Sequence, residues 1–425
     1  MCVQIDASTS QLFLDDAVIE RSVRLRRVIH EPVKHFGNPV YTVQASWEGR
    51  GVIYLGGVYI DPADRLWKAW YVTLFPPEYP EIVYAVCVIY SEDGIRWFRP
   101  ELDVYRGHNG ERTNIVLDLG RAGGTGAPSV MYESENPDEP WVMYLSTCWP
   151  HDSGEYKGYF LRSRDGIHWR WLQERPEGIV HGCSDRMTCM RRPDAEYPYV
   201  IMGRHEAETA RYGLKRVSFC RAVSPERGVQ DGAYEVVVPD LEDDPAGQVY
   251  HARGFPYAGT YVGLFQWFME TDDPYGEMEL VTSRDGLHWT RVPPRRPFLP
   301  RSPGGRALGA FDAQVTDTAL SPPVPTRNGK LDAENPDTLS FYYWGGQSMH
   351  GNRHISWGRG IGLAQLRLDG FCSVRALRYP GTLHTRSFVW PGGRLLLSGH
   401  RPVAYHRRAH YGRREPWSST HTSIS

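Results

Sequence analysis

The sequence has no long hydrophobic run and no excess of charge of one sign. No stretch approaches the about 18 consecutive apolar residues of a transmembrane helix, so a helix spanning a membrane is excluded. The 48 Lys and Arg residues nearly balance the 50 Asp and Glu residues, which gives a formal net charge of −2. This balance argues against a nucleic-acid partner and against binding to a membrane surface.

The sequence also lacks paired cysteines and a secretory leader. Its seven cysteines are scattered, without a CxxC pair and without the Cys/His spacing of a zinc site. The first residues offer neither a basic nor an apolar segment of the kind that starts a signal peptide. These absences predict free thiols in a cytoplasmic protein, with no cofactor and no transition-metal site. A structural calcium ion stays open.

What the sequence does have is turn-forming and aromatic residues. It contains 43 Gly and 32 Pro without a low-complexity run, and 14 Trp and 25 Tyr, which suits an all-β protein. An S-x-D-G-x-x-W segment occurs three times, at 91–97, 163–169 and 283–289. Asp-Gly is a hairpin-turn pair, and a Trp three residues later can pack back over the turn. We interpret the segment as a structural motif without chemistry of its own.

The spacing of these turns indicates a repeat. Degenerate copies at 224–228 and 368–371 raise the number of units to five, each with further strand-like runs upstream. Four short strands per unit, repeated five times, predict an all-β, five-bladed β-propeller. We expect one domain over 1–425, with segments 11–39 and 376–413 closing or decorating the ring. The predicted units are roughly 40–100, 113–172, 180–235, 248–292 and 308–375.

Several segments carry a resemblance to a known group of proteins. They are residues 11–20 (QLFLDDAVIE), 30–39 (HEPVKHFGNP), 184–190 (SDRMTCM), 254–264 (GFPYAGTYVGL), 283–291 (SRDGLHWTR), 297–300 (PFLP) and 360–371 (GIGLAQLRLDGF). The chain resembles glycosyl-hydrolase-like five-bladed propellers, mostly uncharacterised and bacterial, which are related in shape to the fructosidase, arabinanase and mannoside-phosphorylase families. The resemblance implies this fold and carbohydrate chemistry. Without the signal peptide and longer C-terminal β region of usual members, the chain is expected to act inside the cell on a small glycoside or biosynthetic intermediate.

The candidate catalytic residues come from the starts of the innermost strands. In a propeller these strands converge on the axis, so residues just before them line one funnel and can supply paired carboxylates. Glu48, Asp185 and Asp312 are the candidate acids of units one, three and five. Asp185, followed by an Arg, resembles the transition-state-stabilising Asp of related propeller glycosidases. Unit four has no acid at this place, and His251 is its candidate acid or base; Asp317 is a further candidate.

The candidate substrate-binding residues are cationic, aromatic or polar. Arg50 and Arg186 stand beside candidate acids and could orient a hydroxyl or carboxylate. An aromatic ring can stack on a sugar while polar neighbours bond its hydroxyls. On this basis the remaining candidates are Tyr250, Trp267, Arg204, His205, Trp344 and Gln347. The competing interpretation of these positions is structural: surface salt bridges, turn caps and a satisfied core histidine.

Three functions stay open from the sequence. The first is a glycosidase-like enzyme that cleaves a small carbohydrate or glycosylated metabolite with paired carboxylates. The second is a propeller recruited as a lyase, isomerase, transferase or cyclase in specialised metabolism, motivated by the missing acids of units two and four. The third is a non-catalytic sugar-binding or scaffold propeller. The expected partner is a carbohydrate-like small molecule, unless the propeller is only a scaffold. The oligomeric state stays open.

Overall fold

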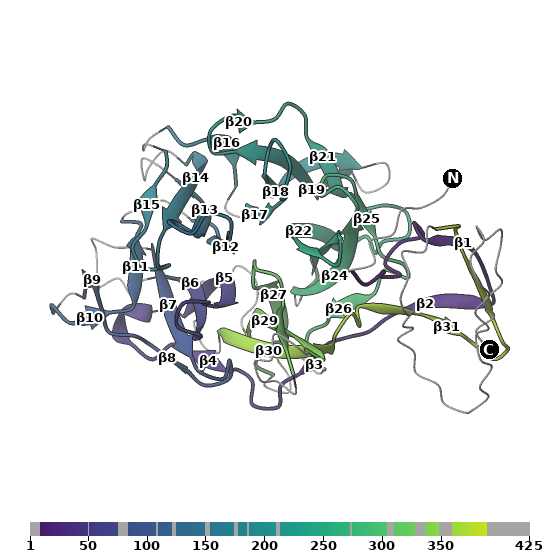
Figure 1. Cartoon of the computed structure of the whole chain (residues 1–425), viewed down its shortest axis with the longest axis horizontal. Helices are drawn as coiled ribbons and strands as arrows, with labels where there is room; N and C mark the ends of the chain where they lie inside the picture. The colour runs from purple at the N-terminus through teal and green to yellow at the C-terminus, as the bar shows by residue number, and fades with distance from the viewer. Residues whose placement is uncertain are drawn as a thin grey trace, which may run out of the picture. The chain divides into compact units, whose positions relative to one another are not determined.

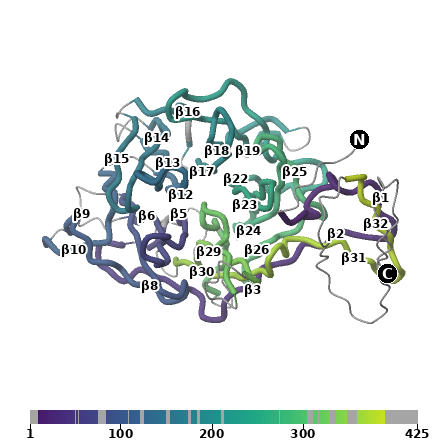
Figure 2. The backbone as a smooth tube through the Cα atoms, viewed as in Figure 1, coloured from purple at the N-terminus to yellow at the C-terminus, as the bar shows by residue number. Residues whose placement is uncertain are grey.

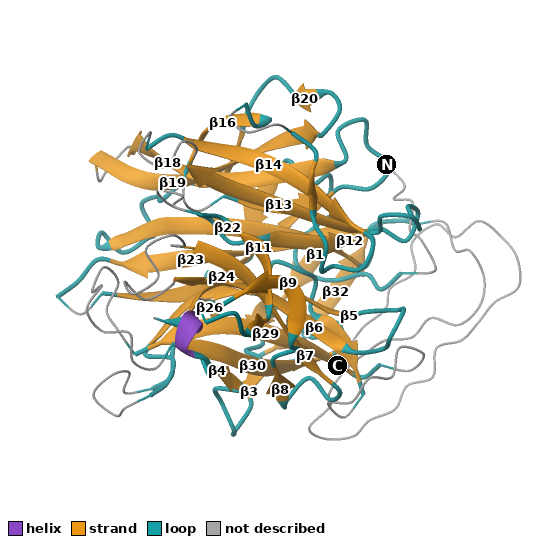
Figure 3. Ribbon diagram, turned by 90° about the vertical axis from the view of Figure 1, so that its left-hand side faces the viewer, coloured by secondary structure: helices purple, strands orange, loops and turns teal. Residues whose placement is uncertain are grey.

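The computed structural model shows an all-β protein. It describes residues 9–388 except 50, 75–83, 108, 121–124, 149–153, 174–176, 185–186, 210–212, 273, 304–309, 328–335 and 348–358. Over these ranges it contains 32 strands and one short 3-10 helix, Ser46–Glu48 (Figure 3). No helix in this part of the chain is long and apolar enough to cross a membrane. The chain forms two compact units: residues 29–371, and the terminal segments 1–28 and 372–425 together.

Four sheets of the larger unit share one five-stranded design, in which strands follow each other as antiparallel neighbours. The first contains β5 (Val52–Ile60), β6 (Trp67–Leu74), β7 (Tyr84–Ser91), β8 (Trp97–Phe98) and β11 (Ile115–Asp118). The second contains β12 (Ser129–Tyr132), β13 (Trp141–Cys148), β14 (Tyr156–Ser163), β15 (Arg170–Trp171) and β16 (Val180–Cys183). The third contains β17 (Thr188–Arg191), β18 (Tyr199–Thr209), β19 (Gly213–Ser224), β20 (Gly228–Val229) and β21 (Tyr234–Val237). The fourth contains β22 (Gly247–Tyr257), β23 (Thr260–Met269), β24 (Tyr275–Ser283), β25 (Trp289–Arg291) and β26 (Pro297–Leu299).

The next sheet is different. It has six strands, β27 (Gln314–Thr318), β28 (Val324–Thr326), β29 (Thr338–Gly346) and β30 (Gly360–Arg367), with β3 (Val33–Lys34) and β4 (Tyr41–Thr42) added beside β30. The segments β3, β29 and β30 of this sheet are labelled in Figure 2. The β-propeller arrangement is confirmed, but the expectation of five like units needs correction. Only four sheets are five-stranded blades made from consecutive sequence. The six-stranded sheet departs from them because strands near the N-terminus satisfy the open edge of β30.

The inner strands β5, β12, β17, β22 and β27 succeed one another around a ring (Figure 1). Direct bonds join neighbours: the Cys189 amide donates to Ser129 Oγ (2.9 Å), Thr188 Oγ1 donates to the Ala252 carbonyl (2.8 Å), and the Leu320 amide donates to the Gly56 carbonyl (2.9 Å). Gly56 and Gly57 approach the carbonyls of Pro128 and Val130, while Thr188 and Met190 approach Ala252 and Gly254, so contacts advance in the same direction on both partners and these inner strands run parallel. We call the face at the starts of the inner strands the mouth: residues 48–54 except 50, 125–129, 184, 187–188, 247–251 and 312–315.

The repeated S-x-D-G-x-x-W segments form near-identical turns. In each, the Ser Oγ accepts a bond from the Gly amide at 2.9 Å, and the Asp Oδ1 accepts bonds from the next two amides at 2.7 or 2.8 Å. The indole donates to the Gly carbonyl at 3.1 or 3.2 Å. The three glycines have φ of 74°, 74° and 78°, which explains why Gly is needed there. The prediction that the segment is a structural turn is confirmed.

Turns at the ends of the strands also bond to side chains of neighbouring sheets at three places. Tyr342 of the six-stranded sheet donates its hydroxyl to the carbonyl of Gly94 in the first sheet (2.7 Å). Trp70 of the first sheet donates to the carbonyl of Gly166 in the second (2.9 Å), and Tyr257 of the fourth donates to Asp369 beyond β30 (2.7 Å). An aromatic side chain thus binds the turn of the following sheet, and Tyr342 makes this bond between the last sheet and the first.

The smaller unit is built from both ends of the chain. Strand β1 (Ile19–Val23) pairs with β32 (Thr382–Thr385), and β2 (Leu25–Ile29) pairs with β31 (Cys372–Ala376). Val18, Ile19 and Leu383 form its small core, with Phe13 packed against them.

Candidate functional site

The mouth is where the sequence places its candidate residues. Arg50, Asp185 and Arg186 lie outside the described residues. The other candidates can be placed, and they fall into three groups: carboxylates held by neighbouring side chains, a buried histidine, and aromatic or cationic residues around the mouth.

Glu48 ends the 3-10 helix that precedes β5, and it is fully buried. Its Oε1 accepts hydrogen bonds from the hydroxyls of Tyr41 and Tyr71, both at 2.5 Å. Its Oε2 accepts bonds from the amides of Gln44 and Ala45, both at 2.8 Å. Burial raises the pKa of both phenols, and the charge of Glu48 raises it further, so both remain donors. With both oxygens occupied and no exposed surface, Glu48 is suited to fixing the loop, and poorly placed to exchange a proton with a substrate.

Asn114, Trp47 and Arg99 surround this network with further polar contacts. Asn114 Nδ2 donates to the Tyr71 hydroxyl (2.9 Å), while Asn114 Oδ1 accepts from the Trp47 indole (3.1 Å). The Arg99 guanidinium lies 3.7 Å from Glu48 Oε2 and over the Trp47 ring. The single negative charge of Glu48 therefore has a cationic partner as well as four donors.

Asp312 lies just before β27 and is also buried, but it is held through one oxygen. Its Oδ2 binds the Lys34 ammonium (2.6 Å) and accepts a bond from the Tyr343 hydroxyl (2.9 Å). Asn38 in turn donates to the Tyr343 hydroxyl (3.1 Å). The described side-chain bonds of Asp312 use Oδ2 only. Because they leave Oδ1 for other partners, Asp312 is suited to the role of a base, nucleophile or charge stabiliser.

The two acids share a design. Each precedes an inner strand and accepts a bond from a Tyr on the second strand of its own sheet, Tyr71 on β6 or Tyr343 on β29. No contact between Glu48 and Asp312 is recorded among the described side chains. The expected catalytic pair is Asp185 with Glu48 or Asp312, and because Asp185 lies outside the described residues this pairing stays a prediction.

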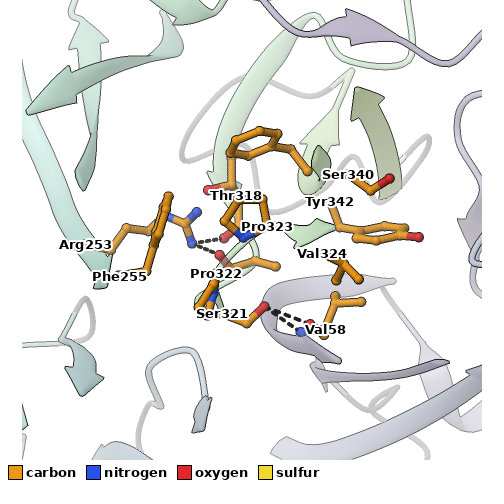
Figure 4. Close-up of a pocket in the computed structure, with 12 residues that line it drawn as sticks. Val58, Arg253, Phe255, Thr318, Ser321, Pro322, Pro323, Val324, Ser340 and Tyr342 are labelled. Atoms are coloured by element: carbon orange, nitrogen blue, oxygen red, sulfur yellow. Dashed lines mark hydrogen bonds between the residues drawn. The ribbon is translucent and has the colours of Figure 1, made fainter. Parts of the chain in front are cut away.

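His251 lies on β22 and meets Asp317 of β27 across the junction between two sheets. His251 Nε2 is 3.0 Å from Asp317 Oδ1, and both side chains are buried. Arg253 Nε lies 3.8 Å from the same oxygen, and its Nη1 donates to the carbonyls of Thr318, at 2.5 Å, and Ala319 (Figure 4). Burial lowers the pKa of Arg253 to about 10, although Asp317 opposes the shift. Their burial favours a role in holding β22 and β27 together.

A small pocket lies beside Arg253, further along the inner strands. Arg253 and Phe255 of β22, Val58 of β5 and the segment 318–324 line it (Figure 4). Ser321 closes one side, because its Oγ accepts from the Val58 amide (2.9 Å) and donates to the Val58 carbonyl (3.0 Å). Arg253 therefore satisfies its charge on backbone carbonyls at the end of β27, away from the mouth.

Tyr250 lies at the mouth with two arginines. The Arg204 guanidinium is 4.1 Å from the centre of its ring, and the Arg216 guanidinium is 5.6 Å from it. Arg204 Nη1 also donates to the Tyr250 carbonyl (3.0 Å). Both arginine residues are half-buried, whereas Tyr250 is 5% exposed. The structure thus brings two of the predicted binding residues, Arg204 and Tyr250, into direct contact.

The other aromatic candidates are mostly packed. Trp344 is buried, with its ring 6.1 Å from that of Tyr54 and the Arg359 guanidinium 5.7 Å away. Trp267 is buried in the core shared by the third and fourth sheets and lies 5.2 Å from the Arg291 guanidinium. These contacts favour structural roles for both indoles.

His205 and Gln347 occupy more open positions. His205 is exposed and lies against Phe219, with ring centroids 5.3 Å apart. Residues successive along a strand point to opposite faces, so His205 faces away from Arg204. Gln347 is half-buried and follows the end of β29.

Sequence reasoning missed several residues of the mouth. Lys34, Tyr343 and Arg216 were not candidates, because they lie on second, third or edge strands far from an inner-strand start. His251 and Arg253 alternate along one strand, and this sequence pattern could have predicted the buried cluster. No group of three or more His, Cys, Asp or Glu side chains arranged to hold a metal ion occurs within the described ranges.

Comparison with known proteins adds solved structures of similar arrangement. No protein-family model matches the chain, and no curated protein does. A thermostable family-43 glycoside hydrolase matches at 12% identity and a TM-score of 0.46, over 80% of this chain and 96% of its own. An N-acetylgalactosamine deacetylase from F. plautii, in complex with blood group B trisaccharide, matches at 13% identity and 0.44, over 86% and 92%. A fructofuranosidase from Schwanniomyces occidentalis, complexed with fructosylnystose, matches at 9% and 0.47, over 84% and 62%. Identities and TM-scores this low assign no activity.

Proposed function

We propose that the protein is a glycosidase-like enzyme acting on a small carbohydrate or glycosylated metabolite bound at the mouth. The observation that carries the proposal is the parallel course of the inner strands. It supports a shared face for Asp312, Tyr250 and Met187, the described residue that follows Asp185 and Arg186, although the three are remote in sequence. Cleavage of a glycosidic bond needs two carboxyl groups on either side of the bond.

Asp312 and Asp185 are the proposed pair. The Lys34 ammonium and the Tyr343 hydroxyl both bind Oδ2 of Asp312, so Oδ1 is the oxygen proposed to act on the sugar or on water. Asp185 then protonates the leaving oxygen, and Arg50 and Arg186 orient the substrate. Glu48 drops out of the proposed chemistry because four donors already occupy its two oxygens.

His251 is a positioning residue in this proposal. With Asp317 and Arg253 it forms a buried ionic cluster that ties β22 to β27. Along β22 the cluster directly follows Tyr250. Along the neighbouring strand it follows Asp312, which lies just before β27. A shift there would move both sides of the mouth.

The experiment is turnover of a panel of 4-nitrophenyl furanosides and pyranosides by the full-length chain. We expect Asp185→Asn and Asp312→Asn each to lower kcat at least about 100-fold, the usual contribution of a positioned proton-transfer group. Asp231→Asn, on an exposed residue, is the matched control and should leave the rate unchanged. Wild-type rates in Asp185→Asn with an unchanged Tm would remove Asp185 from the mechanism. Absence of turnover on every glycoside, with sugar binding retained, would favour a non-hydrolytic propeller enzyme.

We also propose that the six-stranded sheet is the fifth blade and that β3 and β4 close it. The Tyr342 bond to Gly94 supports contact of this sheet with the first one, and the bonds of Arg253 to residues 318 and 319 support contact with the fourth. In this arrangement no inner strand lacks a neighbour on either side, which is the usual solution to exposed sheet edges.

A further inference from the structure

The Tyr250 ring at the mouth is flanked by two guanidinium groups, those of Arg204 and Arg216. Two cations on one ring are unusual, since they repel each other and the ring can compensate only part of the charge. The contact follows from the strand register. Arg204 pairs with Ser218 and Glu206 pairs with Arg216 across β18 and β19, so both arginines lie on the same face of this hairpin.

The two arginines bring two positive charges close to one ring. Arg216 forms no ion pair with any described residue, and its backbone amide is held by Gln248 Oε1 (3.4 Å). Glu206 lies beside it on the same face but is exposed, where a carboxylate compensates a neighbouring charge weakly. The side-chain amide of Gln248 in turn donates to the Glu270 carboxylate, and this bond keeps the Gln248 side chain fixed beside Arg216. The Arg204 guanidinium is thus held by the Tyr250 carbonyl, whereas among the described residues only the backbone amide of Arg216 is bonded.

A guanidinium offers paired N–H donors that match the two oxygens of a carboxylate, or two oxygens of a sulfate or phosphate. Arg216 is half-buried, so an anion bound there is partly shielded from solvent. Tyr250 supplies an adjacent aromatic ring that contacts both guanidiniums. These are the features of a subsite for an anionic substituent.

We propose that the ligand of the mouth is an acidic sugar, and that Arg204 and Arg216 bind its negatively charged group beside Tyr250. This inference rests on the proposed function, since it names the substrate class of the same site. The shared chemistry is an oxyanion on a sugar ring, either the carboxylate of a uronic acid or a sulfate or phosphate ester.

The test is binding measured by calorimetry with matched probes. Methyl glucuronide and methyl galacturonide are compared with the neutral methyl glucoside and methyl galactoside, and glucose 6-sulfate and glucose 6-phosphate form the ester arms. We expect at least one acidic probe to bind more tightly than its neutral counterpart. Arg216→Gln should weaken that binding about tenfold or more, with no effect on the neutral sugars.

Two further variants keep the result interpretable. Lys215→Gln removes one positive charge from the adjacent residue, whose Nζ bonds the Pro245 carbonyl on the other face of the hairpin, and it should bind as the wild type does. Arg216→Lys keeps the charge without the paired donors and should retain part of the affinity. Binding of acidic and neutral probes with equal affinity, or unchanged binding in Arg216→Gln, would overturn the proposal.

The outcome separates this inference from the proposed function. Binding of an acidic sugar that depends on Arg216, without hydrolysis of any glycoside, would leave the subsite standing and reject the glycosidase. Hydrolysis of neutral glycosides at rates unaffected by Arg216→Gln, with no preference for acidic probes, would reject the subsite and leave the glycosidase standing.

Discussion

The Glu48→Gln variant should unfold at a lower temperature than the wild type. The cause is a loss of stability and not the loss of a catalytic group. The carboxylate accepts two phenol hydroxyls on Oε1 and two backbone amides on Oε2. A Gln side chain has one acceptor oxygen, which must serve the amides because they cannot rotate. Its NH2 group then faces Tyr41 and Tyr71, and two buried hydroxyl protons lose their acceptor.

The magnitude follows from these losses. Two hydrogen bonds to a buried charge contribute about 1.5–3 kcal/mol each, and Arg99 loses its counter-charge, so the free energy of unfolding should fall by about 3–6 kcal/mol. For a unit as long as residues 29–371, 1 kcal/mol corresponds to roughly 1–2 °C, and Tm should fall by about 3–12 °C.

Differential scanning calorimetry at neutral pH measures this change. Glu92→Gln is the matched control, because Glu92 is exposed and its loss should shift stability by about 0.5 kcal/mol at most. If Glu48→Gln melts like the wild type, the four bonds do not stabilise the loop as argued. If it melts normally but loses turnover by orders of magnitude, Glu48 is a catalytic residue.

Three further predictions test the ring, the turns and the thiols. Tyr342→Phe deletes the bond that joins the last sheet to the first and should cost about 1–2 kcal/mol in denaturant unfolding; exposed Tyr379→Phe should cost nothing measurable, and equal effects would refute closure through this bond. For Asp165, burial opposes the shift, but bonds from the His168 amide and ring lower its pKa to about 2, below the value of about 4 in an unfolded chain. Its stabilising effect should therefore be full above pH 4 and disappear as pH falls to about 2, so Asp165→Asn and wild type should differ in Tm at pH 7 and converge near pH 2. Burial raises the pKa of the Cys220 thiol to about 12, so a thiol reagent at pH 8 should leave this residue unmodified in mass spectra until denaturant is added; rapid labelling of the native protein would contradict its burial.

Local signals predicted much of this fold. The S-x-D-G-x-x-W turns are fixed by bonds within five residues, so each copy folds in the same way wherever it occurs. Alternating apolar runs beside those turns placed most strands, and the repeat indicated a propeller. The membership of β3 and β4 in the last sheet could not be predicted, because it depends on pairing with β30 far along the chain.

The site was harder to predict for a related reason. Searching ahead of each inner strand found Glu48 and Asp312, which do occupy equivalent places. Whether such an acid is free to react depends on bonds from other strands, such as those of Tyr71 and Lys34, which no local pattern reveals. Arg216 escaped notice because a long hairpin, and not an inner strand, carries it to Tyr250.

Strand β4 pairs with β30, which is synthesised much later, and this order has a consequence for biosynthesis. Tyr41 and Thr42 pair with Ile361 and Gly360, which the ribosome makes about 320 residues later, so at roughly 5–20 residues per second the strand waits for tens of seconds. During that interval the nascent chain must keep an apolar early segment from pairing elsewhere. Translation speed, and any chaperone that covers residues 33–42, would then govern the yield of native molecules more than the final stability of the closed ring does.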